Sequence, residues 1–516
     1  MTSLQSVALS ARATGLTLAR AERVLLALTV LAAAGMMWLA PRLPMIDVPQ
    51  HAAQVALWRD LLLGQSPWSE VVRINLFTPY LIGYGLMLPL SFVFSMEVTT
   101  RLVLTLAFLA FVALCMALRR QFGADRRLDW LFVLSFFGMC WKWGFLTFLV
   151  SSPVFLLFLL LAARHAQDPG GKRSLMLVLA GTFLLFSHGL LFLAALFLGG
   201  LLMLEQVWAR RGEALVARFL PYVVLSVICI GFRLATQQME GAMQNHGFTY
   251  GTPLWQRPLT WLIHITDAED HDNVGFLQLA TAAALCAPLL YGLRLNRRAP
   301  LVLLAGLFAI LCIVPANAFE TGGLFYRFAL FLPPFIAFAF RAPAPMDTAS
   351  ARSFGSGVVL AVSCWLVLGV QGSRIAAFAQ ESKPFETVLA AAQPGKRALA
   401  LILDEDSPAA VNERAYGHWG LWYQAEKHGF VDFNFAFFPP QVIRFRPDHK
   451  AIMDEEERLS LGQYVWPDRF INQYTYVFVR GSAEKVELVK KMSRCPLAIV
   501  ANDGLWFLLE RGACPG

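Results

Sequence analysis

Residues 147–164 read TFLVSSPVFLLFLLLAAR, and this stretch sets the class of fold that the chain can adopt. It carries no charged side chain before Arg164, and a helix needs about 20 mostly apolar residues to cross the hydrocarbon core of a bilayer. Further apolar runs lie near residues 24–40, 76–94, 101–118, 129–145, 174–187, 189–207, 219–235, 275–293, 299–317, 324–340 and 354–372. The pattern predicts a polytopic α-helical membrane protein with about 11 to 13 transmembrane helices.

The composition agrees with this class. Of 516 residues, 57% are hydrophobic and 15% are charged, and the mean hydropathy is +0.55. Soluble domains carry about a quarter charged residues, so an ordinary soluble enzyme is excluded. The net charge of +8 comes largely from Arg and Lys in short loops, where such residues orient a membrane protein. Without a basic tail or a recognisable binding motif, the sequence indicates no nucleic-acid partner.

The basic residues also predict an orientation. Basic stretches, expected in the cytoplasm, lie at 119–127, 164–173, 209–218, 294–298 and 341–352. They alternate with loops poor in basic residues at 141–144, 187–189, 236–274 and 317–326. Arg12, Arg20 and Arg23 precede the first apolar run, so the N-terminus is expected in the cytoplasm, and the alternation of the later loops places the C-terminal region outside. If the N-terminus and the basic stretch 119–127 are both cytoplasmic, the run at 76–94 cannot cross the membrane once. Either this run is re-entrant or paired with a neighbour, or one basic loop is not cytoplasmic. Residues 174–207 are expected to form two helices or one tilted helix.

Polarity divides the chain into two predicted domains. Residues 1–378 form the transmembrane domain, with outer loops at 42–75 and 236–274, and residues 379–516 form an extracytoplasmic α/β domain. Strand-like segments in the second domain lie at 397–403, 474–480, 497–500 and 505–510. Cys495 and Cys514 can form a disulfide in an oxidising compartment or remain two thiols.

The first outer loop contains MIDVPQHAAQVALWRD, residues 45–60. Asp47 followed by Pro49 is typical of a helix start, where Asp caps the helix. His51 then lies one turn further on the same face, and the helix is expected to run to Leu63 along the membrane interface, with Arg59 and Asp60 exposed. The alternative function for Asp47 is catalytic: a carboxylate at this boundary can take a proton from a hydroxyl that attacks a lipid-linked substrate, with the histidine orienting it or sharing the proton.

An acidic residue soon after the first span, an interfacial helix, many spans and a C-terminal domain together resemble the GT-C superfamily of membrane glycosyltransferases. The resemblance implies inverting-type transfer from a polyprenyl-phosphate-linked sugar to an envelope glycan, lipid or protein, on the outer face of a bacterial inner membrane. It implies that Asp47 is the catalytic base, flanked by His51. The sequence Asp-Val-Pro-Gln-His differs from the adjacent acidic pair or the His-Pro-Asp-Glu pattern of several members, which leaves the sugar open.

A lipid-phosphate donor requires cations at the outer membrane surface. Arg327 and Arg73 fall at predicted outer ends of spans, and the planar guanidinium group suits phosphate. Snorkelling at the interface is the structural alternative for both. Lys142 is a weaker candidate, because the flanking Trp141 and Trp143 favour an interface anchor.

Three further residues are candidates for lining the active-site cleft. His188 lies between two apolar runs, where a polar group normally faces a cavity or forms one hydrogen bond in the core. His246 and Trp255, in the second outer loop, can contact sugar rings or lie at the interface.

Two clusters have ambiguous roles. Residues that can bind a divalent metal, or form a solvated loop, are Asp267, Glu269, Asp270 and His271, so no cofactor is certain. In the C-terminal domain, His418, His428 and Asp432 lie in a segment rich in aromatic residues, which predicts an aromatic core or a carbohydrate-binding surface.

Two other functions fit the same pattern. The first is a transporter or flippase for lipid-linked saccharides, although the near absence of charged residues within the spans disfavours it. The second is a non-catalytic subunit of a polysaccharide assembly complex. The expected partners are the bilayer, a polyprenyl-phosphate-sugar donor and a glycan or lipid acceptor.

Overall fold

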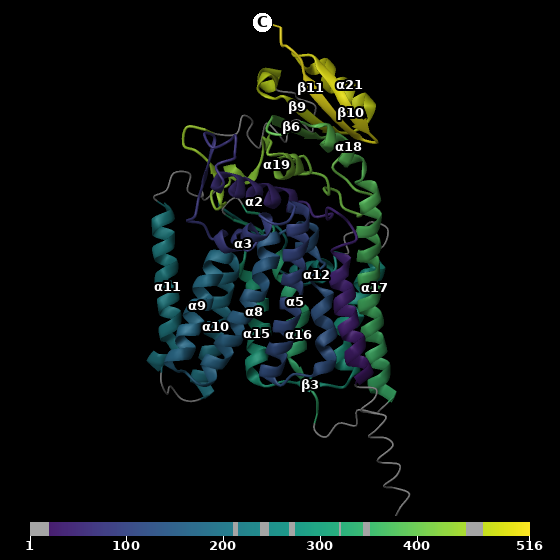
Figure 1. Ribbon diagram of the computed structural model, residues 1–516. Helices are drawn as coiled ribbons and strands as arrows, with labels where there is room; N and C mark the ends of the chain where they lie inside the picture. The colour runs from purple at the N-terminus through teal and green to yellow at the C-terminus, as the bar shows by residue number, and fades with distance from the viewer. Residues whose placement is uncertain are drawn as a thin grey trace, which may run out of the picture.

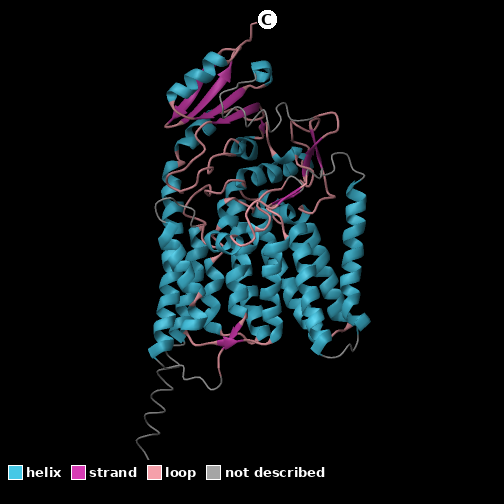
Figure 2. Cartoon of the chain, turned by 180° about the vertical axis from the view of Figure 1, so that it is seen from behind, coloured by secondary structure: helices cyan, strands magenta, loops and turns pink. Residues whose placement is uncertain are grey.

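The fold is a bundle of helices with a small sheet domain at one end (Figures 1 and 2). It comes from a computed structural model that describes residues 20–209, 215–237, 247–267, 274–318, 321–343, 351–449 and 468–515. The long helices are residues 20–36, α5 Met96–Phe122, α8 Leu146–Gln167, α9 Gly171–Ser187, α10 Gly189–Ala209, α11 Leu215–Gln237, α15 Arg298–Ile313 and α17 Ala351–Glu381.

Five described helices are long and apolar enough to cross a membrane. They are Met96–Phe122, Leu146–Gln167, Gly189–Ala209, Leu215–Thr236 and Gly355–Glu381. The chain is therefore a multi-pass α-helical membrane protein with a C-terminal sheet domain, and the predicted fold class is confirmed. The span count of 11 to 13 stays a prediction.

The quoted run 147–164 lies within α8, the most enclosed of these five helices. In its most apolar window, 83% of the residues are buried, against 22% to 50% in the other four. α8 packs against α5, α9 and α10. The run that defines the fold class therefore also lies inside the bundle, against protein.

Several apolar runs form shorter pieces than the sequence predicts. The run 76–94 folds into α3 Leu81–Gly85 and α4 Leu88–Ser91. At 1.5 Å per residue this segment is about 16 Å long, too short for a core of about 30 Å. This agrees with the alternative in which the run is not a simple crossing.

Two predicted continuous spans are wrong in this respect. The run 129–145 is broken into η1 Arg126–Trp130, α6 Leu131–Leu134 and α7 Met139–Lys142. The break is at Gly138, where a Cβ atom would clash with the carbonyl oxygen of Ile265, so close backbone contact replaces helix continuation. The run 324–340 is a 3-10 turn, η2 Tyr326–Phe331, followed by α16 Leu332–Phe338.

Residues 174–207 form two helices rather than one tilted helix. The chain leaves the helical conformation at His188, with φ −166° and ψ 107°, and α10 begins at the next residue. The remaining short elements are α12 Arg257–His264, α13 Val274–Leu285, α14 Ala287–Leu290, and the pairs β2 Phe248–Thr249 with β4 Asn317–Ala318 and β3 Arg294–Leu295 with β5 Phe340–Arg341.

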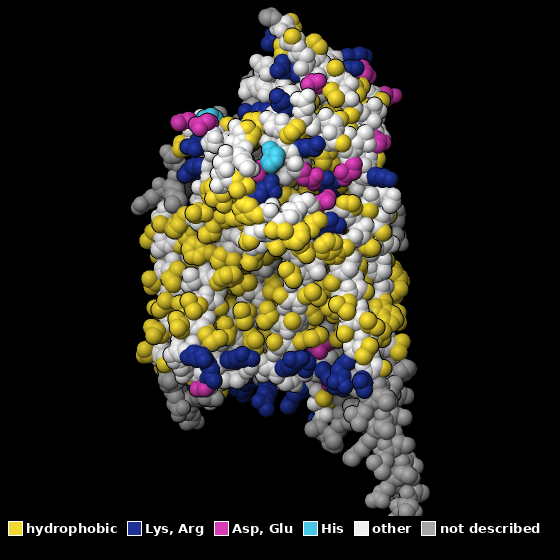
Figure 3. Space-filling view, viewed as in Figure 1, with side chains coloured by type: hydrophobic (Ala, Val, Ile, Leu, Met, Phe, Trp, Pro, Cys, Tyr) yellow, Lys and Arg dark blue, Asp and Glu magenta, His cyan; other side chains and the backbone are white. Residues whose placement is uncertain are grey.

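Surface side chains follow the expected polarity. Figure 3 shows a broad hydrophobic band across the bundle, with a row of Lys and Arg at the end opposite the sheet domain. β3, from a basic stretch predicted to be cytoplasmic, lies at that end (Figure 1). The basic end and the sheet domain are thus on opposite sides of the band; which side is cytoplasmic remains a prediction.

The C-terminal sheet has the strand order β10-β11-β9-β6-β7. Its strands are β6 Arg397–Ile402, β7 Phe430–Val431, β9 Tyr476–Arg480, β10 Leu497–Asp503 and β11 Trp506–Arg511, with helices α18 Pro384–Ala391, α19 Leu421–Lys427 and α21 Ala483–Met492. β6 is parallel to β7 and β9, and β9, β11 and β10 are antiparallel. All four predicted strand segments are present, and the Cys495–Cys514 disulfide is confirmed.

Alternation along the strands gives the sheet two apolar faces. Leu399, Val477 and Val479 belong to a small core that includes Val486 of α21. Their neighbours, such as Phe478, join the main core of the protein, which continues into the helical bundle. The sheet domain is thus packed onto the bundle through one face; the domain boundary at 378/379 stays a prediction.

The helix α2 Val48–Leu62 lies across the end of the bundle, beneath α19 (Figure 1). Twelve of its 15 residues are buried, so the prediction of an interfacial helix with exposed Arg59 and Asp60 is wrong. Asp60 is 2% exposed and its carboxylate lies 2.6 Å from Nδ1 of His428. The sheet domain covers the face of α2 that the sequence predicted to be exposed to solvent.

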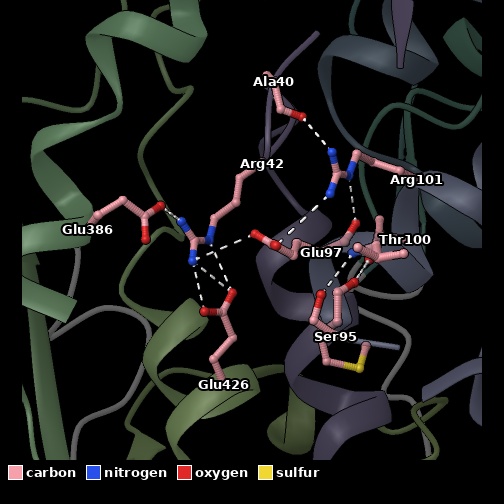
Figure 4. Close-up of polar contacts among 10 residues, drawn as sticks. Ala40, Arg42, Ser95, Glu97, Thr100, Arg101, Glu386 and Glu426 are labelled. Carbon is pink, nitrogen blue, oxygen red and sulfur yellow. Dashed lines mark hydrogen bonds and ion pairs between the residues drawn. The ribbon is translucent and has the colours of Figure 1, made fainter. Parts of the chain in front are cut away.

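The first outer loop and the C-terminal region are joined in two further places. β1 Val72–Ile74 pairs antiparallel with β8 Ile443–Phe445. Arg42, which follows the first helix, bonds Glu386 of α18 and Glu426 of α19, and lies 4.0 Å from Glu97 of α5 (Figure 4). These contacts fix the sheet domain relative to the bundle.

Candidate active site

Asp47 is held in place by its backbone. Its N–H donates to the carbonyl of Trp143 at 3.0 Å, and the N–H of Ile46 donates to the carbonyl of Lys142 at 3.1 Å. Gly144 makes this contact possible, since it has φ +73° and a Cβ atom there would lie 2.8 Å from the backbone nitrogen of Asp47. A side chain at position 144 would displace Asp47.

The side chain of Asp47 is not used as a helix cap. Although Asp47 occupies the N-cap position of α2 and Pro49 lies in the first turn, the carboxylate accepts no capping hydrogen bond from the helix. It is 17% exposed, and its Oδ1 lies 3.4 Å from Nε2 of His418 in the C-terminal domain. The capping interpretation is wrong for the side chain, which leaves the carboxylate available for other contacts.

His51 is buried one turn further along α2. Its Nδ1 lies 2.7 Å from the hydroxyl of Tyr84, which donates to Oε1 of Gln441 at 2.5 Å. The pKa of His51 is lowered to about 4, mainly by burial and also by the charges of Arg327 and His418, while Asp47 acts in the opposite direction. His51 is therefore neutral at pH 7, and it links α2 to the C-terminal region through Tyr84.

Arg327, in η2, lies in the same cluster and is 6% exposed. Its guanidinium carbon is 3.7 Å from the ring centre of Phe145, and its Nη2 donates to the carbonyl of Gly322 at 2.8 Å. Electrostatic interactions connect it with both Asp47 and His51. Among the described residues, no carboxylate lies within 4.0 Å of the guanidinium, and its Nε has no hydrogen-bond acceptor.

His188 is buried beside Arg327, and its two ring nitrogens have no hydrogen-bond partner among the described residues. Its ring lies 5.4 Å from that of Tyr80 and 5.2 Å, edge to face, from that of Phe148. The predicted cleft residue is thus adjacent to the Asp47 cluster. Tyr80, whose ring lies against His188 in this cluster, was not identified from the sequence.

Other candidates lie elsewhere. Arg73 is in β1, where it is paired with Arg444 of β8, and no described contact joins it to Asp47. Trp255 is 78% exposed on the surface of the protein, so its ring does not line an enclosed cleft. His246 lies outside the described residues.

The acidic cluster of the second outer loop is described only at Asp267. Its carboxylate lies 3.3 Å from Nζ of Lys142, which gives the weaker cation candidate an ion-pair partner. Glu269, Asp270 and His271 lie outside the described residues. Within the described part of the chain, no group of three or more metal-ligating side chains occurs.

The structure adds C-terminal residues from the segment for which the sequence predicted an aromatic core or a carbohydrate-binding surface. His418 lies beside Asp47 and borders a small pocket open to solvent, whose other lining residues are Leu399, Ala400, Gly417, Leu421, Val431, Asp432 and Phe433. Gln50 of α2 contacts both His418 and Phe433. No periodicity relates residue 47 to residue 418, so only folding reveals their proximity.

Comparisons with known proteins give little further guidance. No protein-family model matches the chain, and no curated protein matches its sequence. Among solved structures, it is similar to the cryo-EM structure of the arabinofuranosyltransferase AftD from mycobacteria, with 14% identity and a TM-score of 0.48. The similarity covers 95% of this chain and 40% of that one, so the chain spans less than half of that protein's length.

Proposed function

We propose that this protein is a membrane glycosyltransferase that transfers a sugar from a polyprenyl-phosphate donor to an acceptor hydroxyl at the outer membrane surface. The observation that carries the proposal is one cluster that holds both Asp47, a carboxylate free of capping bonds, and Arg327, a buried guanidinium with no carboxylate of the described residues within 4.0 Å. A buried cation without a counter-ion is costly, and binding an anion such as phosphate offsets that cost.

In this mechanism Asp47 accepts the proton of the acceptor hydroxyl as its oxygen attacks the anomeric carbon. The bond between that carbon and the donor phosphate oxygen breaks, and the electron pair leaves with the polyprenyl phosphate. Arg327 stabilises the negative charge that builds on the phosphate. One glycoside and one polyprenyl phosphate form, and attack opposite the leaving group inverts the anomeric centre.

The arrangement of the two domains supports separate routes for the substrates. Arg327 belongs to the helical bundle, from which a lipid-linked donor would arrive, whereas the other neighbour of Asp47 is His418 of the sheet domain. We therefore assign the acceptor to the C-terminal side of Asp47. The outer face of a bacterial inner membrane is the location that we propose.

The test is transfer by purified protein in liposomes. Polyprenyl-phosphate pentoses and hexoses carrying a radiolabel are the donors, and octyl glycosides are the acceptors. Asp47→Asn should reduce transfer by at least about 100-fold, the lower range of a general base, because the amide cannot accept the proton. Asp503→Asn, which alters a carboxylate of β10 bonded to Thr387, is the matched control and should be fully active.

Two results would reject the proposal. If Asp47→Asn transfers sugar at the wild-type rate, Asp47 is not the base. If the wild-type protein moves a fluorescent lipid-linked sugar across the bilayer and forms no glycoside, the transporter function is correct instead.

A further inference from the structure

We propose that His418 of the C-terminal domain is a positioning residue for Asp47, held in one tautomer by Gln50, so that the catalytic centre is complete only when this domain is docked. The inference rests on the proposed function, because it concerns the orientation of the base. Its evidence is the set of contacts between α2 and the segment from residue 418 to residue 435.

The amide of Gln50 has a defined orientation. Its Oε1 accepts from the backbone N–H of Phe435 at 2.9 Å, and its Nε2 donates to the backbone carbonyl of Phe433 at 3.1 Å. If the amide oxygen and nitrogen were exchanged, the NH₂ group would face the N–H of Phe435 and the oxygen would face the carbonyl of Phe433, and neither pair could form a hydrogen bond. The nitrogen of Gln50 is therefore the atom that faces His418.

This orientation determines the proton on His418. Nε2 of Gln50 lies 3.3 Å from Nδ1 of His418, and the amide nitrogen is a donor only. Nδ1 of a neutral His418 is then the acceptor, and the ring proton is on Nε2, the atom that lies 3.4 Å from Oδ1 of Asp47. The imidazole N–H is then on the side of Oδ1, at a distance from which a small movement forms a hydrogen bond, and Oδ2 is left for the acceptor hydroxyl. Such contacts are often long in unliganded enzymes and shorten with substrate.

The ring of His418 is held on its other side by Phe433. The two rings are stacked with centroids 6.1 Å apart and an interplanar angle of 24°. Phe433 has φ +63°, a conformation that is unfavourable for a bulky side chain, and its carbonyl is bonded to Gln50. A strained residue that both supports the imidazole and bonds α2 is consistent with a site that requires a fixed geometry.

The test compares two substitutions of His418 in the full-length protein. His418→Phe removes the donor and should lower kcat by about 100-fold, the lower range of a general base, while KM for the polyprenyl-phosphate sugar stays within about twofold. His418→Gln keeps a side-chain N–H near the position of Nε2, so its kcat should be at least about tenfold higher than that of His418→Phe. Thermal unfolding in detergent verifies that both variants are folded.

His428→Gln is the matched control. His428 belongs to the same domain and contacts the same helix through Asp60, but no described contact joins it to Asp47. It should leave kcat unchanged, whereas an effect as large as that of His418→Phe would mean that domain docking alone is responsible.

Full kcat in His418→Phe, or a His418→Gln variant as inactive as His418→Phe, would overturn the inference. If Asp47→Asn is inactive at the same time, the proposed function survives and only the role of His418 is wrong. If Asp47→Asn is also active, the proposed function itself fails.

Discussion

Two buried arginines, Arg42 and Arg327, lie near the end of the bundle that carries the sheet domain, and they differ in their counter-ions. Arg42 is 4% exposed and bonds Glu386 and Glu426, while Arg327 is 6% exposed and donates to the carbonyl of Gly322. Both also lie against aromatic rings, Arg42 against Trp422 at 5.3 Å and Arg327 against Phe145. The two arginines are therefore buried to a similar extent, and they differ in whether a carboxylate lies beside the guanidinium.

This difference separates a structural cation from a functional one. The partners of Arg42 come from α18 and α19 of the sheet domain, so its charge is used in joining two parts of the chain. The charge of Arg327 is not matched by a neighbouring carboxylate in the described structure, and it acts on Asp47 and His51. A buried charge with no carboxylate beside it in the described structure supports the proposed role in binding an anionic ligand.

The largest expected effect is on activity at Arg327. Arg327→Met should lower transfer by about 100- to 1000-fold, because the cation that stabilises the leaving phosphate is removed. The free energy of unfolding should stay within about 1 kcal/mol of wild type or rise, since an uncompensated buried charge is lost. Labelled-sugar transfer and thermal unfolding measure the two quantities. An active but unstable variant would make Arg327 a structural residue like Arg42.

The opposite result is expected at Arg42. Arg42→Met leaves Glu426, 21% exposed, without its arginine, while Glu97 keeps Arg101 at 4.0 Å. The protein should lose about 2–3 kcal/mol, less than for a fully buried pair because water reaches both carboxylates. Limited proteolysis should release the sheet domain faster. The double variant Arg42→Met, Glu426→Met should recover stability; if it does not, the ion pair is not the cause.

A smaller effect concerns the pH dependence of stability at His51, whose pKa of about 4 is lowered mainly by burial and further by Arg327. In the unfolded chain its pKa is about 6.5, so the unfolded state takes up the proton first. The contribution of neutral His51 is complete above pH 6.5 and is lost as pH falls toward 4, by about 2 kcal/mol between pH 6.5 and 5. His51→Gln should therefore show a smaller decrease in melting temperature on acidification than wild type. An equal decrease would contradict this assignment.

The smallest effect distinguishes the two partners of Arg42. Glu386 is 50% exposed, and exposed ion pairs contribute about 0–1 kcal/mol, so Glu386→Gln should change the free energy of unfolding by less than about 0.5 kcal/mol. Glu426→Gln should cost more, because its carboxylate accepts three hydrogen bonds from Arg42, one from Nε and two from Nη2. Urea or thermal unfolding of the two variants gives the comparison, and equal losses would reject it.

Sequence patterns were reliable where the cause is local. The run at 147–164 forms α8, and the strand segments at 397–403 and 474–480 form β6 and β9, because apolar length and alternation act within one element. The run at 129–145 was wrong as one helix, since contact between Gly138 and the backbone of Ile265 depends on a segment more than 100 residues away.

The candidate site shows the same limit. Asp47, His51, Arg327 and His188 were selected from residue type and position, and folding brings them into one cluster. Arg73 was selected by the same reasoning and lies instead opposite Arg444, because strand pairing with β8 takes it toward the sheet domain. His418 could not be assigned, since a residue from the distant C-terminal region reaches Asp47 only through the packing of α19 on α2.

The sequence by itself determined that this chain is a multi-pass membrane protein with a C-terminal α/β domain, because hydrophobic length and strand alternation specify elements one at a time. It also determined where Asp47 lies along the chain, directly after the first helix. Only the tertiary structure decided that the carboxylate is free of the helix cap, that Arg327 is buried with no carboxylate of the described residues within 4.0 Å, and that His418 lies beside Asp47. Those features depend on contacts between segments far apart in the sequence, which no local pattern encodes.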